Sequence, residues 1–188
     1  DTIWEYQPGG VERGSYVLVF DGADSFVSIS PTDDFLLQFS DTFSIMAWIR
    51  LDETPPNEFT IAGYWNFDAG NPEGNLFWLG INPPDGEGNI LVVFWFQSND
   101  GANMATSSIS VPVNQWTHVA AVYNGTGSDT MQLYINKTLD GAMQCNPCDY
   151  TGSFDYALNS GELSDINIGG SFSGDTSVYN FRGGIDEV

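Results

Sequence analysis

Hydrophobic and polar positions alternate along most of this chain, in short runs separated by clusters of glycine, proline, asparagine and aspartate. Alternation with a period of two predicts half-buried β-strands, and the clusters predict turns. No window of about a dozen residues has an apolar stripe at helical spacing, so any helices are expected to be single turns. The runs rich in β-branched and aromatic residues are 16–20, 26–30, 43–51, 59–65, 76–81, 90–97, 104–111, 116–123, 131–135, 165–168 and 181–188.

The regular recurrence of these runs favours an all-β fold of two stacked antiparallel sheets. In 90–96 both alternate sets of side chains are apolar, which predicts a central strand that is covered on both faces. Aromatic residues make up 14% of the chain, and we assign Trp48, Trp95 and Trp116 to the core.

The length of 188 residues and the hydrophobic content of 41% suit one substantial core. Residues 16–188 are therefore predicted to form one domain, and residues 1–15 an arm or linker. No apolar stretch is long enough to insert into a membrane. The chain begins at Asp1 rather than at Met, which is typical of a secreted protein trimmed from a precursor.

The charge is strongly acidic, with 25 Asp and Glu residues against 4 Lys and Arg residues and a formal net charge of -21. Coulomb repulsion opposes binding to nucleic acid or to an anionic membrane, and cations are the expected partners. The alternative is that the charge only keeps the surface soluble.

Two cysteines, Cys145 and Cys148, stand in a C-N-P-C run. A zinc site would need two further thiolate or imidazole ligands, and thioredoxin-like chemistry would need a βαβ setting. We therefore expect a local disulfide that pins a surface loop in an extracellular protein. The sequons at Asn124 and Asn136 would permit N-glycosylation, although chance also supplies such triplets often.

Three motifs carry a family resemblance. They are the F-D-G-x-D-x-F-V run at 20–27, the W-T-H-V-A-x-V-Y run at 116–123 and the G-x-I-D-E-V run at 183–188. Together they resemble the laminin-G-like and pentraxin-like branch of the concanavalin A-like jelly rolls, which implies a jelly-roll sandwich at the cell surface or outside the cell. Lys137 stands where that family commonly turns on glycine, so we expect a less tight hairpin there.

The resemblance also implies a structural calcium ion. In many relatives the first and last strands run side by side, so Asp186 would meet Asp21 and the neighbouring oxygens of Gly22 and Asp24. Calcium takes six to eight oxygen ligands of this kind. The alternative is that Asp21, Gly22 and Asp24 only form a turn and that Asp186 is a solvated edge residue.

Catalysis is not expected. The E-x-D-x-x-E pattern of the jelly-roll glucanases is absent, as are the nucleophile elbow, the P-loop and the dinucleotide fingerprint. His118, the one histidine, lies among apolar neighbours of a strand and is interpreted as structural.

Carbohydrate binding is the preferred function. Sugars present C–H faces and hydroxyl groups, and their sites combine aromatic rings with polar side chains. The predicted ligand-binding residues are Trp65, Phe67, Asp68 and Asn71, with Trp78 and Trp95 on the strands that follow; the alternative is that these rings fill the core.

The chain is thus interpreted as a secreted or cell-surface binding or adhesion module for glycans or extracellular proteins. A structural subunit of an extracellular assembly is the alternative, and an atypical glycoside hydrolase is the least favoured reading. The last strand stops at Val188. Either the strand is truncated, or the gap is filled by residues 1–10 or by a second molecule, which would be self-assembly.

Overall fold

The computed structural model describes residues 3–6, 16–29, 42–64, 77–98, 101–124, 130–144, 165–170 and 179–188. These ranges contain thirteen strands and no helix, which confirms the all-β class. No helix able to cross a membrane is found in this part of the chain. The strands are β1 (Ile3–Tyr6), β2 (Tyr16–Asp21), β3 (Val27–Ile29), β4 (Thr42–Leu51), β5 (Phe59–Tyr64), β6 (Phe77–Ile81), β7 (Val92–Ser98), β8 (Gly101–Thr106), β9 (Thr117–Asn124), β10 (Thr130–Ile135), β11 (Thr138–Gln144), β12 (Ile166–Ile168) and β13 (Arg182–Asp186).

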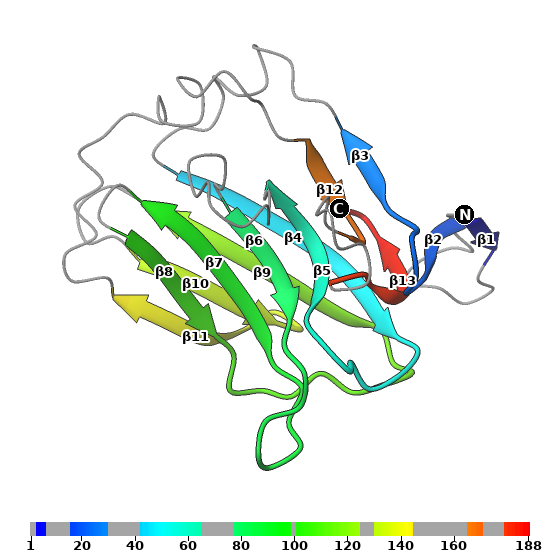
Figure 1. Ribbon diagram of the computed structural model, residues 1–188. Coiled ribbons are helices and arrows are strands. Elements are labelled where there is room, and N and C mark those ends of the chain that lie inside the picture. The colour runs from blue at the N-terminus through cyan, green and yellow to red at the C-terminus, as the bar shows by residue number, and fades with distance from the viewer. Residues whose placement is uncertain are drawn as a thin grey trace.

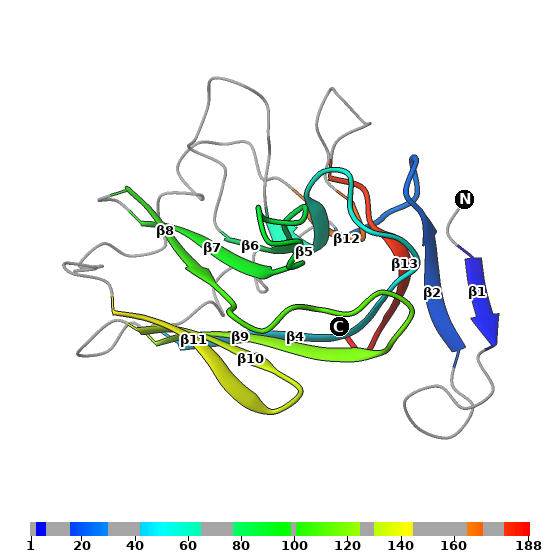
Figure 2. The same ribbon diagram turned by 90° about the horizontal axis from the view of Figure 1, so that it is seen from below.

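The strands form two antiparallel sheets. One has seven strands in the order β1-β2-β13-β4-β9-β10-β11, and the other has six in the order β3-β12-β5-β6-β7-β8. Figure 1 shows the six-stranded sheet in front. Figure 2 separates the two layers and shows β13, β2 and β1 rising at one side of the sandwich. The predicted two-sheet jelly roll is therefore confirmed.

The core lies between the sheets and is built from alternate residues of each strand. In β4, Ala47, Ile49 and Leu51 are buried while the residues between them are partly exposed. Rings from both layers meet at the centre, where Phe96 stacks on Tyr123 with ring centroids 4.4 Å apart. Aromatic pairs at this spacing add to the free energy gained from burial.

The tryptophans assigned to the core lie elsewhere. Ala47 and Ile49 point into the core, so Trp48 points out of the seven-stranded sheet. Trp95 lies between the core residues Phe94 and Phe96 and points out of the six-stranded sheet. The ring of Trp116 covers the outer side of β13, where it reaches Gly184. The prediction was wrong because a ring can be largely buried on the outside of a sheet as well as between two sheets.

The strand predicted to be central is β7. It is covered on both faces, since Val93 and Phe94 are both buried. Its place in the sheet differs from the prediction, because only β8 separates it from the edge.

Two strands were not predicted from the alternation pattern. β1 pairs with the outer edge of β2, so residues 3–6 of the predicted arm belong to the sheet rather than to a linker. β13 lies between β2 and β4 and does not contact this arm as a neighbour. β11 forms part of the stretch that was expected to be irregular.

The hairpin between β10 and β11 is tight, contrary to the expectation from Lys137. Ile135 pairs with Thr138, which leaves a turn of two residues. Asn136 and Lys137 both have positive φ, at 49° and 71°. Two-residue turns need this conformation at both positions, and lysine adopts it at a cost of about 1 kcal/mol.

Candidate functional site

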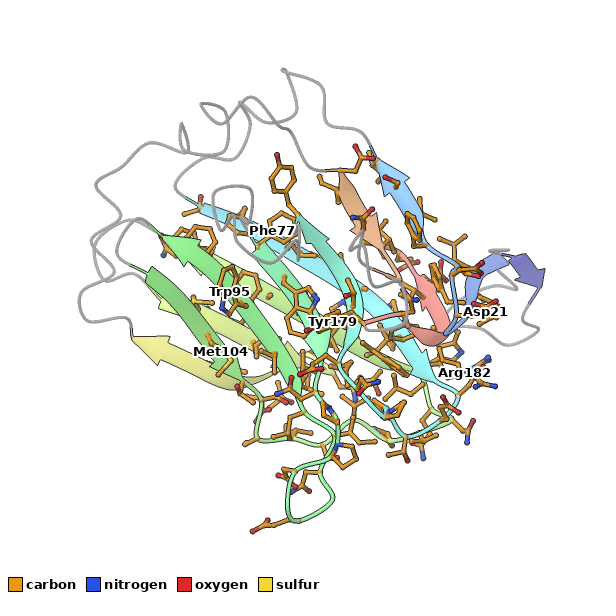
Figure 3. All side chains as sticks on the ribbon, viewed as in Figure 1. Asp21, Phe77, Trp95, Met104, Tyr179 and Arg182 are labelled. Carbon is orange, nitrogen blue, oxygen red and sulfur yellow. The ribbon has the colours of Figure 1, made fainter. Side chains whose placement is uncertain are left out.

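A row of large side chains crosses the outer side of the six-stranded sheet. Trp78 of β6 pairs with Trp95 of β7, and Trp95 pairs with Met104 of β8. Their sequence neighbours point into the core, so all three side chains belong to the outer side. We call this region, defined by Trp78, Trp95 and Met104, the aromatic face. Figure 3 shows Trp95 and Met104 beside each other on adjacent strands.

Trp78 is held in one position. Its indole Nε1 donates a hydrogen bond of 2.9 Å to Thr60 Oγ1. Its six-membered ring lies over Gly80, where a Cβ atom would come within 2.1 Å of Cζ2. Trp78 is 7% exposed, whereas Trp95 is half-buried and Met104 is 50% exposed. The aromatic face therefore has a fixed floor at Trp78 and a more accessible rim.

The same row continues across the sheet into polar residues. Gly63 pairs with both Trp78 and Asn167, and Asn167 pairs with Ser28. Asn167 is 2% exposed, and its Oδ1 has no hydrogen-bond partner. Ser28 Oγ donates to Asp165 Oδ2. Because buried acceptors are normally paired, this unpaired oxygen marks a place for a donor from outside the described residues or from a ligand.

Tyr179 lies against β5 beside this row (Figure 3). Its carbonyl accepts a hydrogen bond of 2.9 Å from the backbone N–H of Thr60, the residue that also holds Trp78. Its φ is 80°, a conformation that is uncommon for a bulky residue and often accompanies functional sites. Burial, with a contribution from the charge of Glu58, raises the pKa of the phenol, which therefore stays protonated at neutral pH.

The residues predicted to hold calcium are not brought together. β2 and β13 do run side by side, as expected, but their register places Asp21 opposite Arg182. Asp186 lies at the other end of β13, opposite Trp48. Within the described ranges, no group of three or more His, Cys, Asp or Glu residues could hold a metal ion. A calcium ion shared by Asp21 and Asp186 does not fit this register.

Asp21 instead organises the turn that follows β2. Its Oδ1 accepts hydrogen bonds of 2.9 Å from the backbone N–H of Ala23 and from Ser25 Oγ. Gly22 supplies the positive φ of 76°. The carbonyl of Ala23 accepts a hydrogen bond from Asn180 Nδ2, so protein donors already occupy several oxygens of the expected calcium site. The hydrogen bond from Ala23, together with those from Ser25, lowers the pKa of Asp21 despite partial desolvation.

We expect Asp21→Ala to lower the free energy of unfolding by about 1 kcal/mol at pH 7, because the turn loses its acceptor. The pKa of Asp21 is depressed in the folded state, so the carboxylate stabilises the fold above its unfolded pKa. This contribution is lost as the pH falls through the folded pKa. The gap between wild type and Asp21→Ala should therefore narrow in urea melts at acidic pH.

Asp21→Asn is the matched control, since the amide keeps an acceptor oxygen, and it should lie between the other two proteins at pH 7. All three differences should be the same in chelator and in calcium. A destabilisation by Asp21→Ala that appears only when calcium is present would restore a metal site at this turn.

The outer side of the seven-stranded sheet contains a second group of interest. Trp48 lies between Asp186 and His118 in the register, and its ring meets the imidazole edge-on with centroids 5.2 Å apart. Asp186 Oδ2 and His118 Nδ1 are buried without hydrogen-bond partners. The two groups are on either side of an indole, and no hydrogen bond joins them.

Several predicted sites lie outside the described residues: Trp65, Phe67, Asp68, Asn71, Cys145 and Cys148. Tyr64 and Phe77, which flank the segment 65–76, are paired, so this segment leaves and rejoins the six-stranded sheet at one point. Asn124 and Asn136 are exposed, and their glycosylation stays a prediction.

The sequence analysis missed the aromatic face because Trp95 was assigned to the core. The available signal was the pattern of 90–96, in which both sets of side chains are apolar. Gly80, two residues after Trp78, was a second signal, since a glycine on the same side of a strand leaves room for a flat ring.

Solved structures show the same fold at low sequence identity. A heptameric SAP-like pentraxin from Limulus polyphemus has a TM-score of 0.56 at 15% identity, over 90% of this chain and 72% of that one. Domains LG4-5 of the mouse laminin alpha1 chain give 0.59 at 13% identity, over 100% of this chain and 43% of that one. Tailspike protein 2 from Escherichia coli O157:H7 bacteriophage CAB120 gives 0.64 at 11% identity, over 98% and 23%.

The laminin and tailspike chains are each more than twice as long as the part that this chain covers. No curated protein matches the sequence. Residues 21–188 match a laminin-G-like family model described as the concanavalin A-like lectin/glucanases superfamily. With this match over most of its length and the jelly-roll topology of its two sheets, the chain belongs to the laminin-G-like branch of the concanavalin A-like lectin/glucanases superfamily.

Proposed function

We propose that this chain is a non-catalytic extracellular binding module that holds a carbohydrate on the aromatic face. The observation that carries the proposal is the fixed indole of Trp78 beside the half-buried ring of Trp95. Sugar rings present apolar C–H faces that pack on aromatic rings, while polar groups nearby set their orientation. A ring that is already immobile loses little conformational entropy when a ligand binds.

The polar end of the row supports the same function. Asn167 Oδ1 and the carboxylate of Asp165 are acceptors that sugar hydroxyl groups can satisfy. Trp65, Phe67, Asp68 and Asn71 remain part of the proposal, because the segment that contains them is attached to the sheet at Tyr64 and Phe77.

Relatives of similar fold act as binding domains. One solved structure is the binding domain of botulinum neurotoxin DC in complex with SialylT, with a TM-score of 0.57 at 17% identity, over 89% of this chain and 38% of that one. At this identity the likeness supports the fold, and the fold hosts many functions, so the ligand must be argued from the residues of this chain.

We expect Trp95→Ala to weaken the binding of any glycan identified on an array by at least about tenfold, because it removes one stacking surface. The matched control is Trp48→Ala, which removes a partly buried tryptophan from the outer side of the other sheet. This control should bind as wild type does. Equal binding by wild type and Trp95→Ala, or an array with no bound glycan, would overturn the proposal.

The superfamily also includes glucanases, so each bound glycan should be recovered after incubation and analysed for cleavage. Intact glycan is the expected result for a binding module.

A further inference from the structure

The basic residues of this protein are absent from the six-stranded sheet. The chain has four of them, Arg13, Arg50, Lys137 and Arg182. Arg50 is in β4, Arg182 is in β13, and Lys137 is in the turn between β10 and β11, all in the seven-stranded sheet. Arg13 precedes β2. The strands of the six-stranded sheet and the segments that join them to one another therefore contain no positive side chain.

Two of the arginines are also engaged where they stand. Arg50 lies over the ring of Trp116, 5.5 Å from its centroid, and its Nε donates to Asp52 at 3.1 Å. Arg182 forms an ion pair of 3.3 Å with Glu53. These contacts leave the acidic residues around the six-stranded sheet without a basic counterpart on that side.

Negative groups stand close to the aromatic face. Asp165 borders the polar end of its row, where it accepts a hydrogen bond from Ser28. Glu58 is near enough to Tyr179 for their charges to interact. With a net charge of -21, the surrounding field is negative. A carboxylate or sulfate on a ligand would be repelled and would find no basic partner on this sheet.

The polar groups of the row are mainly acceptors. Asn167 Oδ1 is buried and unpaired, and the Asp165 carboxylate can only accept. A protonated amine has donors and no acceptor, and a cation is attracted to the face of an aromatic ring. Trp78 and Trp95 supply such rings next to these acceptors.

From this arrangement we infer that the ligand of the aromatic face is an amino sugar with a free, protonated amine. The inference rests on the proposed function and narrows it to cationic glycans. The rings hold the sugar, and the acceptors at Asn167 and Asp165 hold the ammonium group.

The test compares two oligosaccharides of equal length, one of glucosamine and one of N-acetylglucosamine, which differ only in the charged amine. Titration calorimetry at about pH 6, where primary amines are protonated, should show the glucosamine oligomer binding at least about tenfold more tightly. Raising the salt from about 50 to about 500 mM should weaken this oligomer and leave the acetylated one nearly unchanged. A sialylated oligosaccharide should not bind.

Asp165→Asn should reduce the preference for the glucosamine oligomer several-fold while leaving the acetylated oligomer unaffected. Glu87→Gln is the matched control, because it removes one negative charge from the exposed loop between β6 and β7. This control should keep the preference.

Equal or tighter binding of the acetylated or sialylated oligomer would overturn the inference and leave carbohydrate binding at the aromatic face in place. Binding of neither oligomer, together with an array that captures no glycan, would overturn both the inference and the proposed function.

Discussion

Replacing Gly183 by alanine is expected to destabilise the sandwich by about 3–5 kcal/mol, a large part of the stability of a typical domain. The φ of Gly183 is 140°, a region that is open to glycine and strained for other residues. A Cβ atom there would lie 1.9 Å from the carbonyl oxygen of Arg50. That oxygen belongs to the backbone of β4, which is paired on both sides and cannot move without breaking its ladder.

Gly184→Ala is the matched control, since it makes the same chemical change one residue later in the same strand. Its Cβ atom would meet only the ring of Trp116, at 2.7 Å, and a side chain can shift. We expect a loss of about 1–2 kcal/mol for this variant. Urea denaturation of both proteins provides the measurement. Equal losses for the two variants would contradict the backbone clash at Gly183.

Gly80→Ala is expected to produce the second large effect, a loss of about 2–4 kcal/mol together with loss of ligand binding. The added Cβ atom would lie 2.1 Å from Cζ2 of Trp78 and 2.6 Å from the carbonyl oxygen of Phe59. The indole must leave its seat and its hydrogen bond to Thr60, so the floor of the aromatic face is displaced.

Gly86→Ala is the control for this variant, because a Cβ atom at Gly86 would meet no atom within 4 Å. Stability should be measured by urea melts and Trp78 packing by near-ultraviolet circular dichroism. Binding should be measured at a temperature where both proteins are folded. A Gly80→Ala protein that keeps its stability and its ligand would show that Trp78 does not form the floor of the site.

Strand positions could be predicted closely where alternation is strong. The run 43–51 became β4 at Thr42–Leu51, and the run 116–123 became β9 at Thr117–Asn124. β11 was missed because Gly141 and the polar residues around it break the alternation. It is a strand because the two-residue turn at Asn136 and Lys137 returns the chain directly along β10.

The candidate metal site shows a different limit. The family motifs correctly placed the first predicted strand next to the last, as β2 beside β13. They carried no information about the register, which puts Arg182 opposite Asp21 and moves Asp186 to the far end. Because one residue of rise along a strand is about 3.3 Å, a shift of a few residues is enough to separate two ligands of one ion.

The sequence by itself determined the all-β class, the superfamily and the confinement of basic residues to four positions, because these follow from local alternation, motifs and composition. The tertiary structure alone decided that Trp78 and Trp95 lie on the outer side of a sheet and that Asp21 and Asp186 are apart. Alternation sorts the residues of a strand into two sets, but it does not say which set faces the other sheet when both are apolar. That choice, like the register, is made by the partner strands and the opposing layer, which are distant in the sequence.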